Sequence, residues 1–346
     1  MDSGKVKLCM LGFGNAGKEF CRLLLHKSEE IRSTYGYQVL VTDIATKSKG
    51  TLSNENGIDL ARALHEVEGE DRFKSDNPDL VGRNSIETIG TTAADVLVEL
   101  STLSIKDGQP AISHIETALN SGMHVITANK GPIAWDYKRL KKLACSKGLL
   151  LLHETTVMDG TPVFNLAKET LPGCKVISFK GILNSTTNFI LEEMENGRSF
   201  AEALKEAQRR GFAEADPSMD IDGWDAAAKT AAIANVLMNG ELNPMSVERT
   251  GISGITLTDI EKAKQEGKKI KLLCEGYEEN STIKGRVYPK LFDERDIFSN
   301  IDSTSSIVSI TTDLMGEICI VERNPEIQQT AYGIYSDLLT LLKELK

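Results

Sequence analysis

The 346-residue sequence predicts an α/β protein with a doubly wound parallel sheet, and two observations support this prediction. An apolar segment at residues 5–11 runs directly into a glycine-rich turn at 12–17, which is followed by a helical pattern. Beyond this unit, strand-like and helix-like segments alternate, as they do in βαβ units. The chain is long enough for two domains with separate cores, so we expect a second domain after the sheet.

The glycine-rich turn has the sequence GFGNAG and lies between the strand at 5–11 and a helix predicted over 18–25, as a dinucleotide-binding unit requires. In such a unit one glycine permits the tight turn, one lets the backbone approach a pyrophosphate, and one lets helix and strand pack closely. The start of the helix favours phosphate through its amides and dipole. A chance glycine-rich turn is the alternative. We predict a Rossmann-type sheet with cofactor contacts at Gly12, Gly14, Asn15, Ala16 and Gly17.

The end of the second predicted strand, at 38–46, bears on the choice of cofactor. In NAD-binding proteins this strand usually ends with an acid that binds the adenine ribose. Here Asp43 comes early, and two lysines and small hydroxyl residues follow in the segment 46–49. We therefore predict that NADP(H) is preferred over NAD(H), with the 2′-phosphate near Thr46 and Lys47. A solvated basic turn is the alternative.

Two more strands are predicted at 95–100 and 124–127, with a helix near 109–121 between them. Ligands in such sheets bind at the carboxyl ends of the strands. We predict cofactor contacts at Thr102 and Asn129, which follow these ends, and Lys130 near the nicotinamide. A lysine at a strand end is more often plain surface.

A helix predicted over 224–238 is apolar nearly all round, which is the pattern of a buried helix. Asp225 and Lys229 lie one turn apart on it, and the segment 211–225 carries five carboxylates. An exposed ion pair at this spacing stabilises a helix by only about 0.2–0.5 kcal/mol. A buried pair costs several kcal/mol per ion before the attraction offsets it. A functional site is therefore predicted here.

Over nearly its whole length the chain resembles the homoserine dehydrogenases. The matching segments are the glycine-rich turn, 127–132, 181–191, 211–229 and 336–339. The resemblance implies a dinucleotide-binding domain at 1–153 and an α+β catalytic and dimerisation domain with a mixed sheet at 154–327. It also implies that a C-terminal helix at about 328–346 packs back on the first domain. The implied reaction is the reversible NAD(P)-dependent reduction of L-aspartate 4-semialdehyde to L-homoserine, in threonine and methionine biosynthesis.

The same resemblance implies roles for individual residues. Lys229 matches the proposed general acid and base, Asp225 its partner, and Lys130 a second catalytic lysine. The implied substrate-binding residues are Glu214, Asp220, Thr186 and Ser185. Backbone carbonyls at four positions match a sodium site: Glu154, Val157, Asp159 and Thr161.

The chain also departs from the family pattern. Ser185 stands where the family usually has glycine, and Met158 and Asp159 where it has two small residues. The segment 321–327 lacks the usual Gly-Ala-Gly, and 302–306 lacks a usual Gly and Asn. We expect Arg323 either to contact substrate or cofactor, or to mark a loop that has withdrawn from the site. An exposed loop with no role is the alternative. A relative that acts on another small hydroxy acid or amino alcohol, and a non-catalytic NADP-binding sensor, remain alternatives.

Composition limits the other function classes. The net charge of −10 argues against nucleic acid or an anionic membrane as the main partner. No apolar run approaches the length of a membrane span, and the N-terminus has no signal-peptide pattern. The six cysteines are scattered and the five histidines lack ligand spacing, so we expect a reducing cytoplasm and no zinc site. The expected protein is a homodimer that acts on a small molecule, in a short form without an aspartokinase or ACT regulatory domain.

Overall fold

The computed structural model describes residues 4–346, which form two compact units. Unit 1 holds the described residues up to Pro132, together with Asp136–Pro162 and Glu326–Lys346. Unit 2 holds Ile133–Trp135 and Val163–Pro325. None of the helices in residues 4–346 combines the length and the apolar character needed to cross a bilayer.

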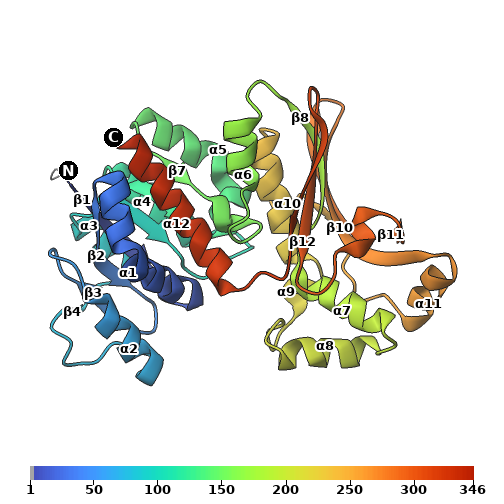
Figure 1. Ribbon diagram of the computed structural model, residues 1–346, viewed down its shortest axis with the longest axis horizontal. Helices are drawn as coiled ribbons and strands as arrows, with labels where there is room; N and C mark the ends of the chain where they lie inside the picture. The colour runs from blue at the N-terminus through green and yellow to red at the C-terminus, as the bar shows by residue number, and fades with distance from the viewer. Residues whose placement is uncertain (1–3) are drawn as a thin grey trace. The chain divides into compact units, whose positions relative to one another are not determined.

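Unit 1 contains the doubly wound sheet that the sequence predicts (Figure 1). Its seven strands lie in the order β4-β3-β2-β1-β5-β6-β7, and the neighbours from β2 to β7 are parallel. The short β3 and β4 continue the sheet antiparallel beyond β2. The strand bounds are β1 (Lys5–Leu11), β2 (Gln38–Ala45), β3 (Thr51–Ser53), β4 (Leu80–Val81), β5 (Val96–Glu99), β6 (His124–Thr127) and β7 (Leu151–Leu152).

The longest helices of unit 1 are its first and last. Helix α1 and helix α12 lie side by side (Figure 1), and Leu338, Leu341 and Leu342 of α12 are buried in the same core as Phe20 of α1. The end of the chain therefore completes the core that its beginning starts. The helix bounds are α1 (Asn15–Tyr35), α2 (Leu60–Glu70), α3 (Ser85–Thr91), α4 (Ala111–Asn120), α5 (Lys130–Ser146), the short 3-10 helix η1 (Glu154–Thr156) and α12 (Ile327–Glu344).

Unit 2 contains the mixed sheet that the resemblance implies. Its strands lie in the order β13-β12-β8-β10-β11-β9, antiparallel except that β9 runs parallel to β11. Strands β10 and β11 form a long hairpin whose turn residues, Asn280 and Ser281, have φ of 50° and 62°. Two positive φ values are those of a type I′ turn, whose twist suits a hairpin. The strand bounds are β8 (Val176–Ile182), β9 (Glu248–Arg249), β10 (Lys268–Glu279), β11 (Thr282–Asp293), β12 (Ser306–Thr312) and β13 (Gly316–Glu322).

Helix α10 is the buried helix of unit 2. It packs on β10 and β11, and its residues Ala226–Ala228 and Ala231–Ala234 are fully buried, as its apolar pattern predicts. Helix α7 packs on α8 and on β10. The bounds in unit 2 are α6 (Val163–Asn165), η2 (Leu166–Thr170), α7 (Ser185–Glu195), α8 (Phe200–Arg209), α9 (Ser218–Ile221), α10 (Trp224–Leu237), α11 (Leu257–Gln265) and η3 (Ile297–Asn300).

Candidate functional site

The turn between β1 and α1 has the geometry of a phosphate-binding turn. Gly12 has φ of +104°, and a Cβ there would lie 2.4 Å from the carbonyl oxygen of Leu100, so only glycine fits. A Cβ on Gly17 would lie 3.0 Å from the carbonyl oxygen of Gly12, which shows how closely helix and turn pack. No heavy atom lies within 4 Å of a Cβ built on Gly14, where α1 begins. The turn is therefore open where a pyrophosphate would approach the helix N-terminus, so its residues fit a dinucleotide.

The acid on β2 is turned into the protein rather than towards a ligand. Asp43 is 2% exposed and accepts hydrogen bonds from the hydroxyls of Ser53 (2.8 Å) and Thr42 (2.9 Å). In the turn that follows, Thr46 Oγ1 donates to Gly50 O (2.8 Å) and accepts from Lys49 N (2.8 Å).

The two lysines of this turn differ in their surroundings. Lys49 forms an ion pair with Asp71, whereas Lys47 is exposed. The strand end therefore offers a ligand an exposed lysine and no exposed carboxylate from Asp43.

At the ends of β5 and β6 the chain is held by Asn129. Its Oδ1 accepts from Gly131 N (3.0 Å) and caps α5, while its Nδ2 donates to Ser101 O (3.0 Å). This ties the end of β6 to the loop that carries Thr102, which is exposed. Lys130 is the first residue of α5 and is half-buried.

In unit 2 the turn between β8 and α7 gathers two carboxylates. Asn184 is the N-cap of α7, and its Oδ1 accepts from Thr187 N (2.8 Å). Its Nδ2 donates both to Asp220 Oδ1 (2.6 Å) and to Asp225 Oδ2 (3.0 Å). No role was predicted for Asn184 from sequence. An asparagine ahead of Ser-Thr-Thr is a helix-start pattern, but that pattern does not predict contacts with distant carboxylates.

Lys229 completes this cluster. Its Nζ lies 3.4 Å from Asp225 Oδ2 and donates to Leu183 O (2.5 Å). The side chains of Lys229 and Asp225 are 18% and 15% exposed. The pair is therefore largely desolvated and still reachable by a small molecule. We call Asn184, Asp220, Asp225 and Lys229 the reactive cluster.

The structure brings some of the predicted substrate-binding residues to the reactive cluster. Burial, and then the negative charge of Asp225, raise the pKa of Asp220, while hydrogen bonds from Asn184 and Thr186 act in the opposite direction. Thr186 is buried and also donates to Phe212 O (2.6 Å), and Ser185 beside it is half-buried. Glu214 is exposed, and its carbonyl accepts from Gln208 (3.0 Å).

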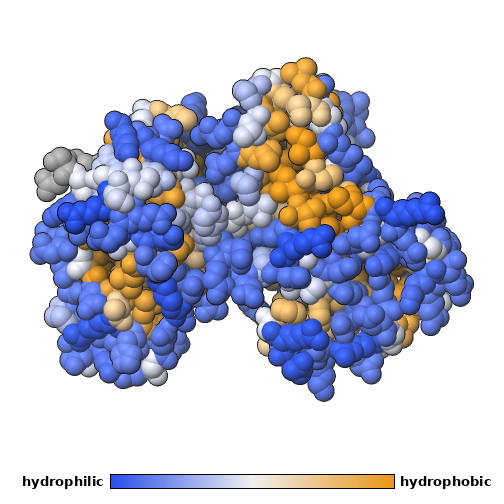
Figure 2. All heavy atoms as spheres, in the orientation of Figure 1, coloured by the Kyte–Doolittle hydropathy of each residue, from blue (hydrophilic) through white to orange (hydrophobic). Residues whose placement is uncertain are grey.

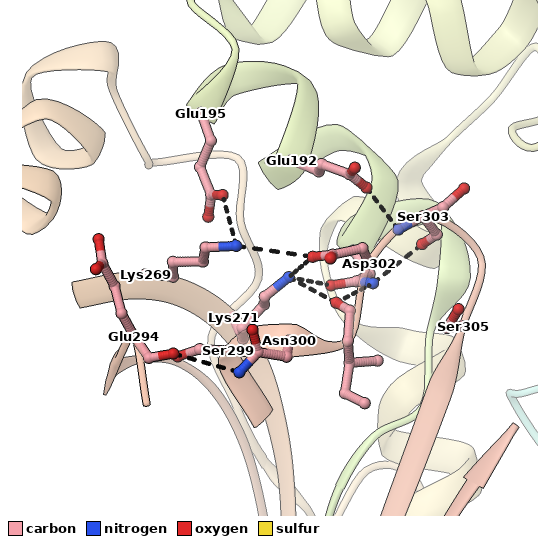
Figure 3. A network of polar contacts seen from close by, with 12 residues as sticks. Glu192, Glu195, Lys269, Lys271, Glu294, Ser299, Asn300, Asp302, Ser303 and Ser305 are labelled. Atoms are coloured by element: carbon pink, nitrogen blue, oxygen red, sulfur yellow. Dashed lines mark hydrogen bonds and ion pairs between the residues drawn. The ribbon is translucent and has the colours of Figure 1, made fainter. Parts of the chain in front are cut away.

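A second polar network, centred on Lys271, was not predicted (Figure 3). Lys271 is 0% exposed, and its Nζ donates to Ile301 O (2.7 Å) and Asn188 Oδ1 (3.0 Å). It also lies 3.7 Å from Asp302 Oδ1. Asn188 Nδ2 donates to the carbonyls of Ile301 (2.9 Å) and Ser303 (3.0 Å). Burial lowers the pKa of Lys271. We call Lys271, Asn188 and Asp302 the buried cluster after its lysine and asparagine; the side chain of Asp302 is 52% exposed.

The segments that depart from the family pattern keep a glycine-like backbone. Ser303, Asn324 and Asp159 have φ of 56°, 43° and 43°, in the left-handed region that favours glycine. Larger residues therefore occupy a backbone path that glycine follows most easily. Arg323 is exposed and lines a cavity of about 120 Å³ together with Asp302 and Ser303.

The segment proposed to hold sodium is a compact turn of unit 1. Glu154 N donates to Asp337 Oδ2 (3.0 Å) of α12, and Thr330 Oγ1 donates to Asp159 Oδ1 (2.5 Å). Thr161 N donates to Met158 O (2.8 Å) and closes the turn. The four residues named for their carbonyls therefore lie in one short segment fixed against α12.

Two family models match this chain. The model described as homoserine dehydrogenase matches residues 162–339, and the model described as homoserine dehydrogenase, NAD binding domain, matches residues 12–154. The chain belongs to the homoserine dehydrogenase family. The homoserine dehydrogenase of Methanocaldococcus jannaschii is 35% identical over 98% of this chain and 99% of its own. The NAD(+)-dependent homoserine dehydrogenase of Pseudomonas canavaninivorans is 33% identical over 96% of this chain and 95% of its own.

Solved structures show the same relationship. A crystal structure from Archaeoglobus fulgidus has a TM-score of 0.85 at 34% identity and covers 97% of this chain and 99% of its own. The homoserine dehydrogenase of Thiobacillus denitrificans has a TM-score of 0.83 at 29% identity, over 99% of this chain and 74% of its own. These findings confirm the predicted fold, the nicotinamide cofactor and the oxidoreductase chemistry at a CH–OH group.

Proposed function

We propose that this homoserine dehydrogenase uses Lys229 to exchange a proton with the hydroxyl oxygen of homoserine. The supporting observation is the position of Lys229 Nζ, which lies 3.4 Å from Asp225 Oδ2 and 2.5 Å from Leu183 O. The side chain of Lys229 is 18% exposed. Two oxygens hold the amine in one place, and the remaining exposure leaves it within reach of a substrate.

The two directions of the reaction need the lysine in different states. The chemistry that a nicotinamide would supply when bound is hydride transfer, from the alcohol carbon in the oxidation and to the aldehyde carbon in the reduction. In the oxidation, a neutral Lys229 takes the hydroxyl proton. In the reduction, a protonated Lys229 stabilises the negative charge that develops on the carbonyl oxygen and then gives up its proton. Asp225 orients the amine, and Lys130 is proposed as the second catalytic lysine.

The carboxylates near the lysine are proposed to bind the substrate ammonium. Asp220 is half-buried beside Asp225, so a cationic group would stabilise its charged form, as a charge-assisted hydrogen bond does. Glu214 is proposed for the same role, and Ser185 and Thr186 for contacts with the rest of the substrate. The pocket would then select for an amino group at the carbon next to the carboxylate.

A substrate series tests this function. Purified protein should oxidise L-homoserine, measured by absorbance of the reduced nicotinamide. Removal of the amino group, as in 4-hydroxybutyrate, should lower kcat/KM at least about 100-fold, because the carboxylates then lose their cationic partner. 3-Amino-1-propanol, which lacks the carboxylate instead, shows which end is recognised. A hydroxy acid or amino alcohol that exceeds homoserine would favour a different substrate for this family member.

We also propose that NADP(H) is preferred over NAD(H). The support is the strand end described above, where Asp43 is buried and Lys47 is exposed, near the place of a 2′-phosphate. The Pseudomonas canavaninivorans relative is named NAD(+)-dependent, so the charge at this turn is the point to test.

Lys47→Ala should raise the KM for NADPH roughly 5-fold or more and change that for NADH less than about twofold, since one phosphate contact is lost. Lys49→Ala is the matched control, because Lys49 already pairs with Asp71. A wild-type protein that turns over NADH better than NADPH, or an unchanged ratio in Lys47→Ala, would overturn the preference.

For the remaining predictions we propose that unit 1 is the dinucleotide-binding domain and unit 2 the catalytic and dimerisation domain. The proposed bounds are 1–153 and 154–327, and compact unit 1 reaches Pro162. The carbonyls of Glu154, Val157, Asp159 and Thr161 are proposed to hold sodium, a hard cation suited to oxygen ligands. Exchange of sodium for choline should then lower the melting temperature.

A homodimer is proposed from the surface of unit 2. Figure 2 shows apolar side chains gathered over its sheet. The exposed apolar residues of its strands include Ile177 of β8 and Leu291 of β11. Apolar patches of this kind mark association surfaces. Analytical ultracentrifugation should find a dimer. A cytoplasmic location stays a prediction from the scattered cysteines.

A further inference from the structure

The amide of Asn184 makes hydrogen bonds in three directions. Its oxygen accepts from Thr187 N at the start of α7, and its nitrogen donates one bond to each of two carboxylates. The reverse orientation of the amide would set its oxygen against both carboxylates and its nitrogen against a backbone N–H. The cap therefore fixes the amide so that both of its protons point at the carboxylates.

This arrangement offsets the repulsion between two neighbouring carboxylates. Asp220 and Asp225 are both largely buried and bond to the same nitrogen, so their negative charges repel each other. Two carboxylates this close tend to share a proton, as paired carboxylates do in other proteins. A shared proton would occupy the oxygen with which Asp225 faces Lys229. The bonds from Asn184 favour the charged form of each carboxylate without adding a charge.

The same turn of chain also holds the lysine. Leu183, which precedes Asn184, accepts from Lys229 Nζ at 2.5 Å. Residues 183 and 184 therefore set the positions of both the amine and its carboxylate partner.

We propose that Asn184 is a positioning residue for the reaction, which keeps Asp220 and Asp225 separately charged and so keeps Asp225 engaged with Lys229. The proposal rests on the proposed role of Lys229. Asn184 does not exchange protons with the substrate. The charged groups that bond to it or lie next to it in the cluster are Asp220 of α9 and Asp225 and Lys229 of α10.

Asn184→Asp is the sharpest test, because aspartate caps a helix as well as asparagine but cannot donate to the two carboxylates. Turnover of homoserine should fall roughly 10- to 100-fold. The added negative charge stabilises the protonated form of Lys229, so the pH of half-maximal homoserine oxidation should move upwards by about one unit. The melting temperature should fall by several degrees, because the new carboxylate lies beside two others that are already largely desolvated.

Two further variants separate positioning from folding. Asn184→Ser keeps a capping oxygen without adding a charge, and should lower turnover less than Asn184→Asp and move the pH profile less. Ser199→Ala removes the N-cap of α8, away from the reactive cluster, and should leave kcat within about twofold of wild type. If Asn184→Asp does not fold, the pH profile of Asn184→Ser decides the question.

A wild-type kcat and pH profile in the Asn184 variants would overturn the proposal. So would a loss of kcat with an unmoved pH profile, because that is the behaviour of a purely structural residue. The double variant with Lys229→Met identifies the cause: Asn184→Asp should lower the residual turnover no further if it acts through the lysine. Near-wild-type turnover in Lys229→Met alone would instead refute the proposed function.

Discussion

The reactive cluster and the buried cluster of unit 2 are built from the same three residue types. Each contains a lysine, an aspartate and an asparagine of α7 or its cap: Asn184 in one case, and Asn188 one turn later in the other. They differ in exposure, because the side chain of Lys229 is 18% exposed and that of Lys271 is 0% exposed. They differ also in the groups that accept from the lysine amine: two neutral oxygens for Lys271, and a carbonyl and a carboxylate for Lys229.

These differences assign different roles to similar residues. Lys271 donates to two neutral oxygens, Ile301 O and Asn188 Oδ1, and so fixes the segment 301–303 to α7. It is sealed from solvent and cannot exchange a proton with a substrate. Lys229 is held by one carbonyl and one carboxylate and remains within reach of a small molecule. Exposure and acceptor type, rather than composition, therefore separate proposed chemistry from support.

The largest expected effect belongs to Lys229→Met. Turnover of homoserine should fall by roughly two to four powers of ten, because the group that exchanges the proton is lost. Cofactor binding and the melting temperature should change little, since the variant keeps an unbranched side chain of similar length. Stopped-flow and steady-state absorbance of the reduced nicotinamide provide the measurement. Near-normal turnover would move the proton transfer to Lys130 or to water.

Lys271→Met should show the opposite pattern. The loss of two buried hydrogen bonds should destabilise the protein by about 1–3 kcal/mol and lower its melting temperature by several degrees. We expect kcat to stay within about threefold of wild type. Scanning calorimetry and steady-state kinetics on the same preparations check both values. A large loss of kcat with normal stability would mean that the buried cluster takes part in the reaction.

A smaller effect is expected from Asp220→Asn, as a function of pH. The folded-state pKa of Asp220 lies above its ordinary value, so ionisation costs stability. This cost grows as the pH rises from the ordinary value towards the folded-state pKa and is constant above it. The variant should therefore melt higher than wild type near pH 7, by roughly 1–3 °C. The difference should close as the pH falls towards the unfolded-state value of about 3.8.

Asp216→Asn, in the turn just before α9, is the matched control for this pH dependence. Hydrogen bonds from Ser218 lower the pKa of Asp216, so its charged form contributes stability above the ordinary value. Its replacement should lower the melting temperature at neutral pH, the reverse of the Asp220 result. Equal signs for the two variants would show that burial does not govern the titration of Asp220.

The parts of the fold that follow from local pattern were predictable from sequence. Strands β1 and β6 end at the predicted residues because each is a short apolar run bounded by polar or glycine residues. The helix predicted over 18–25 extends to Tyr35. The extension was not predicted, because the last turns of the helix are mostly polar and bury only Ile31. Strand β7 is confined to Leu151–Leu152 within a longer apolar run.

Contacts between distant elements were not predictable in this way. The spacing of Asp225 and Lys229 predicts a shared face, because it depends only on helix geometry. The bonds of Asn184 to the carboxylates, and of Asn188 to Lys271, join elements that are 36 to 83 residues apart. A single sequence contains no local pattern for such pairs. The positive φ of Ser303 likewise depends on the path of the surrounding chain.

The return of α12 to unit 1 has a consequence for how the protein is made. Leu338, Leu341 and Leu342 belong to the same core as Val6 of β1, so that core cannot close until the ribosome has synthesised the last helix. Unit 2 consists of Val163–Pro325 and the short segment Ile133–Trp135. All of it is synthesised before the last helix. Domains usually fold in the order of synthesis. In this chain unit 1 therefore begins synthesis first but cannot complete its core until the whole of unit 2 has been synthesised.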